Sequence, residues 1–173
     1  MRKLCVVMLA IGLLAPTAAA SAERAAPGDG SLVVSNANGR LYVSGSGVIF
    51  GHLDSGSITV VGDYKPDDNS ALPTVSGATV KVRGHNLVYA GTDVRFLFPS
   101  GRYTLVVDGI GIDISAVGKG QLAAVGAGFP DDGSYAADGG KPAAIDSLGV
   151  ATFGNTSFGP GKGVAVASSG RGK

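Results

Sequence analysis

Short triplets in which two apolar residues flank a more polar one recur along the chain from Gly30 to Gly126. Tyr103-Thr104-Leu105 is one example. An alternation with a period of two places successive side chains on opposite faces, which is typical of β-strands with one buried face. Glycine stands between most triplets, where it suits tight changes of direction. The pattern therefore predicts an all-β fold built from short strands.

An eighteen-residue unit that holds two such triplets occurs three times. The copies begin at Gly45, Gly91 and Gly109. The first and third align without a gap, the second needs a one-residue deletion before Ser100, and the second and third are contiguous. A shortened copy precedes Gly45, and another supplies the triplet ends Val80/Val82 and Leu87/Tyr89. Self-similarity at a fixed period predicts stacked or radially repeated β-structure.

Two folds satisfy this repeat. In a repeat-built β-solenoid each unit is one coil, so the second and third copies stack directly and Arg95 becomes the neighbour of Asp113. The alternative is an antiparallel β-sandwich or barrel of hairpins, in which a loop at Pro99 to Arg102 sets Arg95 opposite Val106. Contiguous copies whose apolar columns match favour the solenoid.

Either fold makes the same prediction about the core. The apolar ends of the triplets are expected inside, whereas Thr59, Arg95 and Thr104 are expected to face outward. The residues expected to be buried are Val48, Phe50, Ile58, Val60, Val94, Phe96, Tyr103, Leu105, Ile112, Ile114 and Leu122.

The repeat domain is expected to span 30–126, interrupted by a polar surface loop at 63–77 that contains two prolines. A polar lead-in at 23–29 comes before the repeat domain. After it we expect an irregular cap at 127–159, because a terminal repeat must cover its backbone edge and apolar face. The Gly-, Ser- and Ala-rich tail at 160–173 is expected to be disordered.

Residues 1–22 have the organisation of a secretory signal peptide. Arg2 and Lys3 are followed by an apolar stretch from Leu4 to Leu14, and Ala20-Ser21-Ala22 fits a cleavage site. The apolar stretch is too short to span a bilayer, which takes about 20 residues. We therefore expect cleavage, no membrane span in the mature chain, and a secreted, periplasmic or cell-surface location.

Composition narrows the function classes. Cleavage would remove the one cysteine, Cys5, and two of the 14 Lys and Arg residues, which leaves 12 basic against 13 acidic residues. A nearly balanced charge disfavours a nucleic-acid partner. A cysteine-free exported chain must be held by burial and backbone hydrogen bonds. Of the 173 residues 29 are glycine and none is tryptophan, so the core depends on aliphatic residues.

Candidate chemistry is sparse. His52 and Asp54 resemble a dyad, and Asp67-Asp68-Asn69 is rich in the oxygen ligands that Ca²⁺ prefers. The same holds for Asp131-Asp132 with Asp138, and Gly109 to Asp113 fits part of a calcium-binding nonapeptide repeat. Asp and Asn are ordinary turn residues, and the dyad fits a solvated turn between strands. We therefore predict no catalytic, cofactor-binding or metal site and no cofactor.

These observations predict a secreted or surface-exposed structural or binding module without catalytic activity. Its ligand class is a cell-wall glycan or a surface protein, bound by the loop at 63–77 or by an exposed strand face. The alternative is a carbohydrate-active enzyme on a β-solenoid scaffold, which would need two carboxylates facing one cleft. The carboxylates within the full repeats are Asp54, Asp93, Asp108 and Asp113.

Overall fold

The computed structural model describes residues 26–62, 72–125, 133–145 and 149–155. Over this part the chain is all-β, as predicted. Seven strands form one antiparallel sheet, in which the order β2-β3-β1-β4-β7 gives the main path and β5 and β6 pair beside it. The strands are β1 (Gly30–Val60), β2 (Thr74–Arg83), β3 (Asn86–Phe98), β4 (Arg102–Val125), β5 (Ser134–Ala137), β6 (Ala143–Ala144) and β7 (Val150–Phe153).

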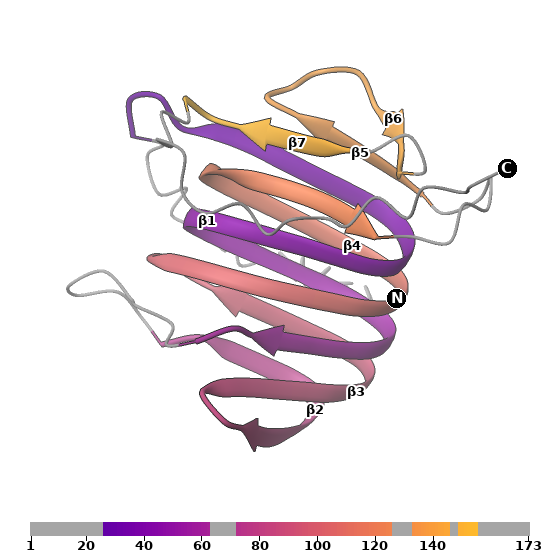
Figure 1. The fold of residues 1–173 in the computed structure, drawn as a ribbon. Coiled ribbons are helices and arrows are strands. Elements are labelled where there is room, and N and C mark those ends of the chain that lie inside the picture. Colours follow the sequence, from indigo (N-terminus) through magenta and orange to yellow (C-terminus); the bar gives the residue numbers. More distant parts are fainter. Residues whose placement is uncertain (1–25, 63–71, 126–132, 146–148, 156–173) are drawn as a thin grey trace, which may run out of the picture.

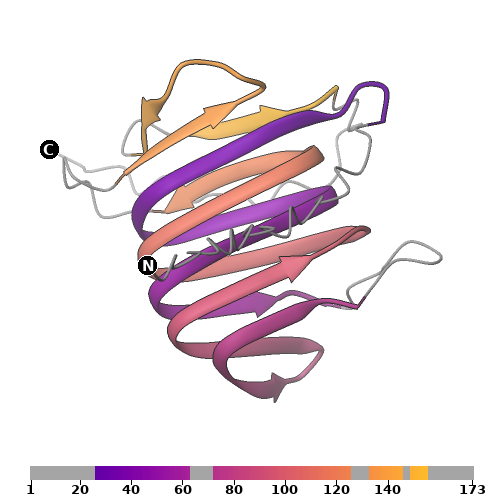
Figure 2. The same ribbon diagram turned by 180° about the vertical axis from the view of Figure 1, so that it is seen from behind.

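The sheet winds around its own core. β1 and β4 are 31 and 24 residues long, well beyond the usual strand length of 3 to 10 residues. Val107 of β4 pairs on one side with Leu41 and on the other with Ile58, which lies seventeen positions further along β1. Strand β1 therefore returns to the same β4 residue after one turn, and Figures 1 and 2 show β1 and β4 alternating along the resulting stack.

The second and third copies of the eighteen-residue unit lie on either side of one segment of β1. Gly56 pairs with Gly91 on one side and with Gly109 on the other, eighteen positions apart. The second and third copies of the unit therefore lie in matching columns. Strand β1, which runs antiparallel to both, lies between them.

Both sequence-based predictions of local register are wrong. His52 pairs with Arg95 and also with Asp113, so these two residues lie two strand spacings apart, about 10 Å, and are not direct neighbours. Nor does Arg95 face Val106, since Val106 pairs with Tyr42 and Thr59. An antiparallel sheet whose inner faces pack against each other is compatible with the sandwich alternative.

The core lies inside the wound sheet. Nine of the eleven residues expected there are buried, and Arg95 and Thr104 are exposed as expected, whereas Thr59 is half-buried. Val48 is half-buried and Phe50 is 48% exposed, because Ile49 takes the inward position. The first copy runs antiparallel to the third, so the strands paired with it decide which of its residues face inward. Ile49 pairs with Phe98 and Ala116, which are both buried.

Glycines form the corners of the winding. Gly39, Gly109, Gly56 and Gly91 pair in sequence across neighbouring strand segments. A Cβ on Gly109 would lie 3.0 Å from the Cα of Gly56 and closer still to the carbonyl oxygen of Ser55. Only glycine lets the backbones approach this closely at a corner. Between the pairs Ala37–Ile112 and Gly39–Gly109 strand β4 has one residue more than β1, so the bulge beside Asn38 belongs to β4.

Strands β5, β6 and β7 close one end of the stack, drawn at the top of Figure 1. β5 pairs with the start of β1, and β7 pairs with the end of β4, which brings Phe153 opposite Gly120. Phe153 is fully buried and Ile145 is nearly so. The segment expected to be an irregular cap thus includes three short strands.

The loop expected at 63–77 is shorter than predicted, and other predictions concern residues that the structure does not describe. Strand β2 begins at Thr74, so the last four residues of the expected loop at 63–77 belong to a strand. Residues 63–71, the signal peptide expected at 1–22 and the disordered tail expected at 160–173 lie outside the described residues.

Candidate functional site

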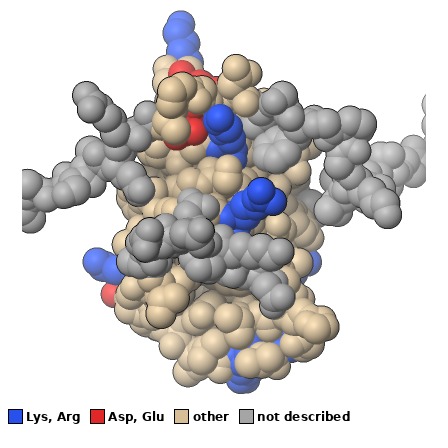
Figure 3. Space-filling model, turned by 90° about the vertical axis from the view of Figure 1, so that its left-hand side faces the viewer, with Lys and Arg blue, Asp and Glu red and all other residues tan. Residues whose placement is uncertain are grey.

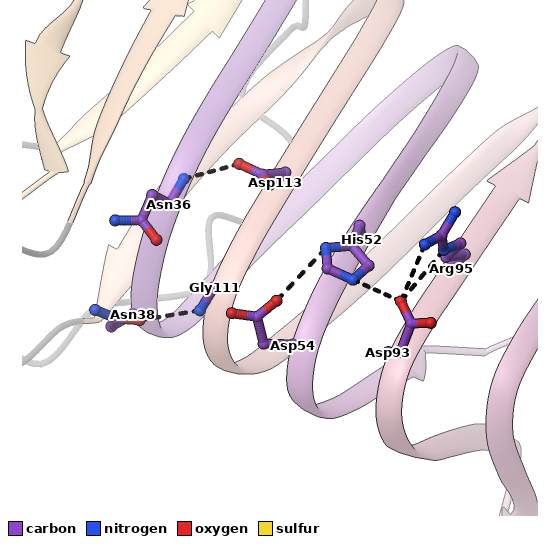
Figure 4. Close-up of polar contacts among 8 residues, drawn as sticks. All are labelled: Asn36, Asn38, His52, Asp54, Asp93, Arg95, Gly111 and Asp113. Carbon is purple, nitrogen blue, oxygen red and sulfur yellow. Dashed lines mark hydrogen bonds and ion pairs between the residues drawn. The ribbon is translucent and has the colours of Figure 1, made fainter.

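A polar cluster occupies one corner of the outer face, where strands β1 and β3 are paired (Figure 4). The imidazole of His52 lies between two carboxylates: its Nε2 is 2.9 Å from Oδ1 of Asp93, and its Nδ1 is 3.8 Å from Oδ1 of Asp54. Arg95 donates to the same Asp93 oxygen from Nε at 3.3 Å. Asp54 was identified from the sequence, whereas Asp93 and Arg95 come from another strand.

Asp93 is the electrostatic centre of this cluster. The guanidinium of Arg95 and, to a smaller degree, the imidazole of His52 lower the pKa of the Asp93 carboxyl below its ordinary value. Asp93 also has a positive φ of 50°, a left-handed conformation that Asp tolerates better than most residues. The cluster therefore fixes a corner of β3 against β1.

Two further contacts join the next turn of the winding to this corner. The backbone N–H of Asn36 donates to Oδ1 of Asp113 at 2.9 Å, and the side-chain oxygen of Asn38 accepts from the backbone N–H of Gly111 at 3.0 Å. These bonds satisfy backbone groups where the ladder is interrupted, by a bulge of β1 at Asn36 and by a bulge of β4 at Gly111. The Asp113 carboxylate thus has a structural contact within the repeat, and so does the backbone of Gly111.

The geometry of the cluster does not resemble a catalytic centre. Both ring nitrogens of His52 face carboxylates, so neither is directed at a nucleophile. The imidazole also lies between Asp54 and Asp93, where a glycosidase would need to place the sugar or the water. A shallow groove of about 390 Å³ beside the cluster is lined by Phe50, Gly51, His52, Arg95, Asp113 and Ser115.

The other residues singled out in the sequence have separate roles. Asp138 accepts hydrogen bonds from the backbone N–H groups of Ser31 and Gly154, each at 3.0 Å, and so ties the cap to β1. Asp108 forms an ion pair with Arg40. Within the described ranges no group of three or more His, Cys, Asp or Glu side chains could hold a metal ion. The Asp67/Asp68 and Asp131/Asp132 groups lie outside those ranges.

The end of the stack opposite the cap exposes the inner face of the sheet. Directly paired residues in an antiparallel ladder have their side chains on the same face. Val60 pairs with Leu87, which pairs with Val82, and their exposed fractions rise from 1% to 36% to 72%. In the neighbouring column Ile58 pairs with Tyr89, which pairs with Val80. The exposed fraction rises from 0% at Ile58 to 57% at Val80. The apolar interior thus continues into solvent at β2.

A cavity of about 570 Å³ opens at this end, within the 300–1,000 Å³ range of ligand pockets. Its wall is mostly apolar, with His85 and Asn86 as polar groups. The lining residues are Val60, Gly62, Leu72, Pro73, Val82, Gly84, His85, Asn86, Leu87, Tyr89 and Phe98. We refer to this cavity together with Val80 and Val82 as the open end.

Sequence reasoning identified these residues but not their exposure. Val80/Val82 and Leu87/Tyr89 have the same alternation as the buried triplets, and this alternation predicts strands with one buried face. Their exposure follows from their position, because β2 is the last strand on the main path of the sheet and, in the part of the chain that the structure describes, pairs with β3 alone. The signal available in the sequence was that this shortened copy directly follows a loop that interrupts the repeat.

The open end is also basic on its outer side. Lys81 and Arg83 alternate with the valines of β2, so they project from the opposite face, and both are exposed. At the bottom of the face drawn in Figure 3, where the β2 end lies, the only charged side chains in view are basic.

Comparison with protein-family models, with curated proteins and with solved structures gives no match for this chain. In the part of the chain that the structure describes, no helix has the length and apolar character needed to cross a membrane. Any functional inference therefore depends on the geometry of the molecule itself.

Proposed function

We propose that this protein is a secreted or surface-exposed binding module, and that its ligand binds at the open end. The observation that carries the proposal is the difference between the two ends of one continuous apolar interior. β5, β6 and β7 cover one end, where Phe153 and Ile145 are buried. At the other end Val80 and Val82 stay exposed beside a cavity of ligand size. Exposed apolar surface of this kind marks interaction sites.

We also propose that the wound sheet acts as a β-solenoid scaffold of interleaved type, in which each repeat forms one turn. The pairing of Val107 with both Leu41 and Ile58 supports this, as does the pairing of Gly56 with both Gly91 and Gly109. In such a scaffold the two ends are the natural places for specialised surfaces, because inner turns have neighbours on both sides.

The alternative, a carbohydrate-active enzyme, has less support. Asp54 and Asp93 are the carboxylates that come closest to a pair, and both contact His52. Asp108 is paired with Arg40, and Asp113 accepts a backbone hydrogen bond. None of these four faces the cavity at the open end.

Export is tested separately by intact-mass analysis of protein released from the producing cells. We expect a mature chain that begins at Glu23, after the Ala20-Ser21-Ala22 site. Exported material that retains Met1 to Leu14 would contradict the signal-peptide assignment.

Binding is tested by screening the protein against a glycan array and a random peptide display library, in parallel with two variants. Val82→Asp puts a charge into the open end, and Val150→Asp puts the same charge on an exposed valine of β7 at the capped end. We expect ligands that bind the wild type and Val150→Asp but lose at least tenfold in affinity for Val82→Asp. Ligands that bind all three proteins equally would refute the proposed site.

A further inference from the structure

Within the described ranges, one edge of strand β2 has no paired strand, and this edge lies beside the open end. It is ten residues long and pairs with β3 on one side, whereas β7, at the other end of the main path, has four residues. The register shifts between Ser76 and Ala78, where Gly77 alone lies opposite three residues of β3, and from Ala78 to Arg83 the ladder is regular. The free N–H and C=O groups of a regular edge are a template for a further strand.

Both side-chain faces of this edge lack partners among the described residues. On the inner side Val80 and Val82 remain exposed. On the outer side Lys81 and Arg83 are exposed, and no described carboxylate forms an ion pair with either. An incoming strand would therefore meet apolar and basic positions in alternation.

The charges distinguish between two occupants of the edge. If β2 paired with β2 of a second copy about a two-fold axis, registers that bring the valines together would place Lys81 opposite or diagonal to its symmetry mate. Like charges at these positions destabilise a ladder, and edge lysines commonly prevent self-association in this way. A strand with acidic side chains at those positions would instead be attracted.

We propose that Ala78 to Arg83 of β2 binds an extended segment of a partner protein, in which apolar or β-branched residues alternate with Asp or Glu. This inference rests on the proposed binding function and specifies its ligand. The segment adds one antiparallel strand by backbone hydrogen bonds. Its apolar side chains cover Val80 and Val82 and reach the cavity, and its carboxylates face Lys81 and Arg83.

The test uses a displayed library of random twelve-residue peptides, selected on the wild-type protein in about 50 mM salt, where charge pairs are weakly screened. Selected peptides are synthesised and titrated against four variants. Two change the edge, the double variants Lys81→Glu/Arg83→Glu and Lys81→Gln/Arg83→Gln. The others are Val82→Asp and the control Lys141→Glu, which reverses an exposed lysine in the cap. Thermal unfolding checks that each variant is folded.

We expect the selected peptides to show acidic residues at every second position and to lack proline within that stretch. Their affinity should fall at least tenfold for the glutamate double variant, less for the glutamine double variant, and not for Lys141→Glu. Raising the salt to about 500 mM should weaken binding. Hydrogen exchange should show added protection of the backbone amides between Ala78 and Arg83.

The outcomes separate this inference from the proposed function. Peptides that lose affinity for Val82→Asp but bind the charge-reversed variant normally would leave the open end as the site and overturn the acidic-strand ligand. An absence of selected peptides, or peptides that protect no β2 amide, would overturn it as well. Dimerisation of the protein that competes with peptide would identify a second copy as the occupant. Peptides insensitive to Val82→Asp would refute the proposed function itself.

Discussion

The glycine corners give a sharp quantitative test of the winding, through the substitution Gly109→Ala. Gly109 lies between Gly39 and Gly56 in neighbouring strand segments. The added Cβ would lie 3.0 Å from the Cα of Gly56, about 0.5 Å inside the favourable distance of 3.5 Å between carbon atoms. It would come closer still to the carbonyl oxygen of Ser55.

These contacts cannot be relieved by rotating a side chain, because both neighbouring atoms belong to the backbone. The segment around Gly56 is also held on its far side by pairing with Gly91. Overpacking a well-packed site costs about 1–3 kcal/mol and occasionally more. We therefore expect Gly109→Ala to reduce the free energy of unfolding by about 3 kcal/mol, the upper end of that range.

The assay is urea unfolding followed by circular dichroism, since the chain has no tryptophan. Gly149→Ala is the matched control, because a Cβ there meets no atom within 4 Å. A Gly→Ala change without strain stabilises by about 0.4–1 kcal/mol through the unfolded chain, so the control should be neutral or slightly stabilised. If Gly109→Ala lies within about 1 kcal/mol of the wild type, below the overpacking range, the close packing at this corner is refuted.

Three further predictions concern single side chains. Phe96→Ala should lower the free energy of unfolding in urea by about 3–5 kcal/mol, because Phe96 is buried against Phe98. A loss under about 1 kcal/mol would contradict the buried position of Phe96. Tyr103→Phe should leave stability unchanged or raise it by about 1 kcal/mol, since the buried hydroxyl has no hydrogen-bond partner among the described residues; a clear loss would show that the hydroxyl has a partner. The lowered pKa of Asp93 contributes stability above its ordinary pKa of about 4 that is lost as the pH falls through the folded-state value. Asp93→Asn should therefore lose less stability than the wild type on acidification below about pH 4, and identical acid profiles would contradict this contribution.

The inward face of the later copies could be predicted from the sequence. Val94, Phe96, Ile112 and Ile114 alternate with polar residues, and all four are buried. The spacing of the glycines also predicts where neighbouring strand segments approach each other closely, as Gly56 and Gly109 do. These features are local, and burial on one face fixes the side-chain alternation of a strand.

Strand order and direction could not be predicted in the same way. A repeat of eighteen residues fits direct stacking, and it fits equally well an antiparallel strand inserted between the copies. Ile49 rather than Phe50 faces inward because Phe98 and Ala116, which are distant in the sequence, set the phase of that segment. The hydrogen bond between His52 and Asp93 could not be predicted for the same reason, since 41 positions separate the two residues.

The exposure of Val80 and Val82 depends on which strand is the last one, and the triplet pattern does not contain that information. It is also the observation on which the proposed function depends. The most direct measurement is methyl NMR of the protein with a soluble paramagnetic agent, which broadens the signals of solvent-exposed methyl groups. We predict strong broadening for Val80 and Val82, partial broadening for Leu87, and none for Val60 or for Ile145 under the cap. If the methyl groups of Val82 are as protected as those of Val60, the β2 end is closed and the proposed binding surface does not exist.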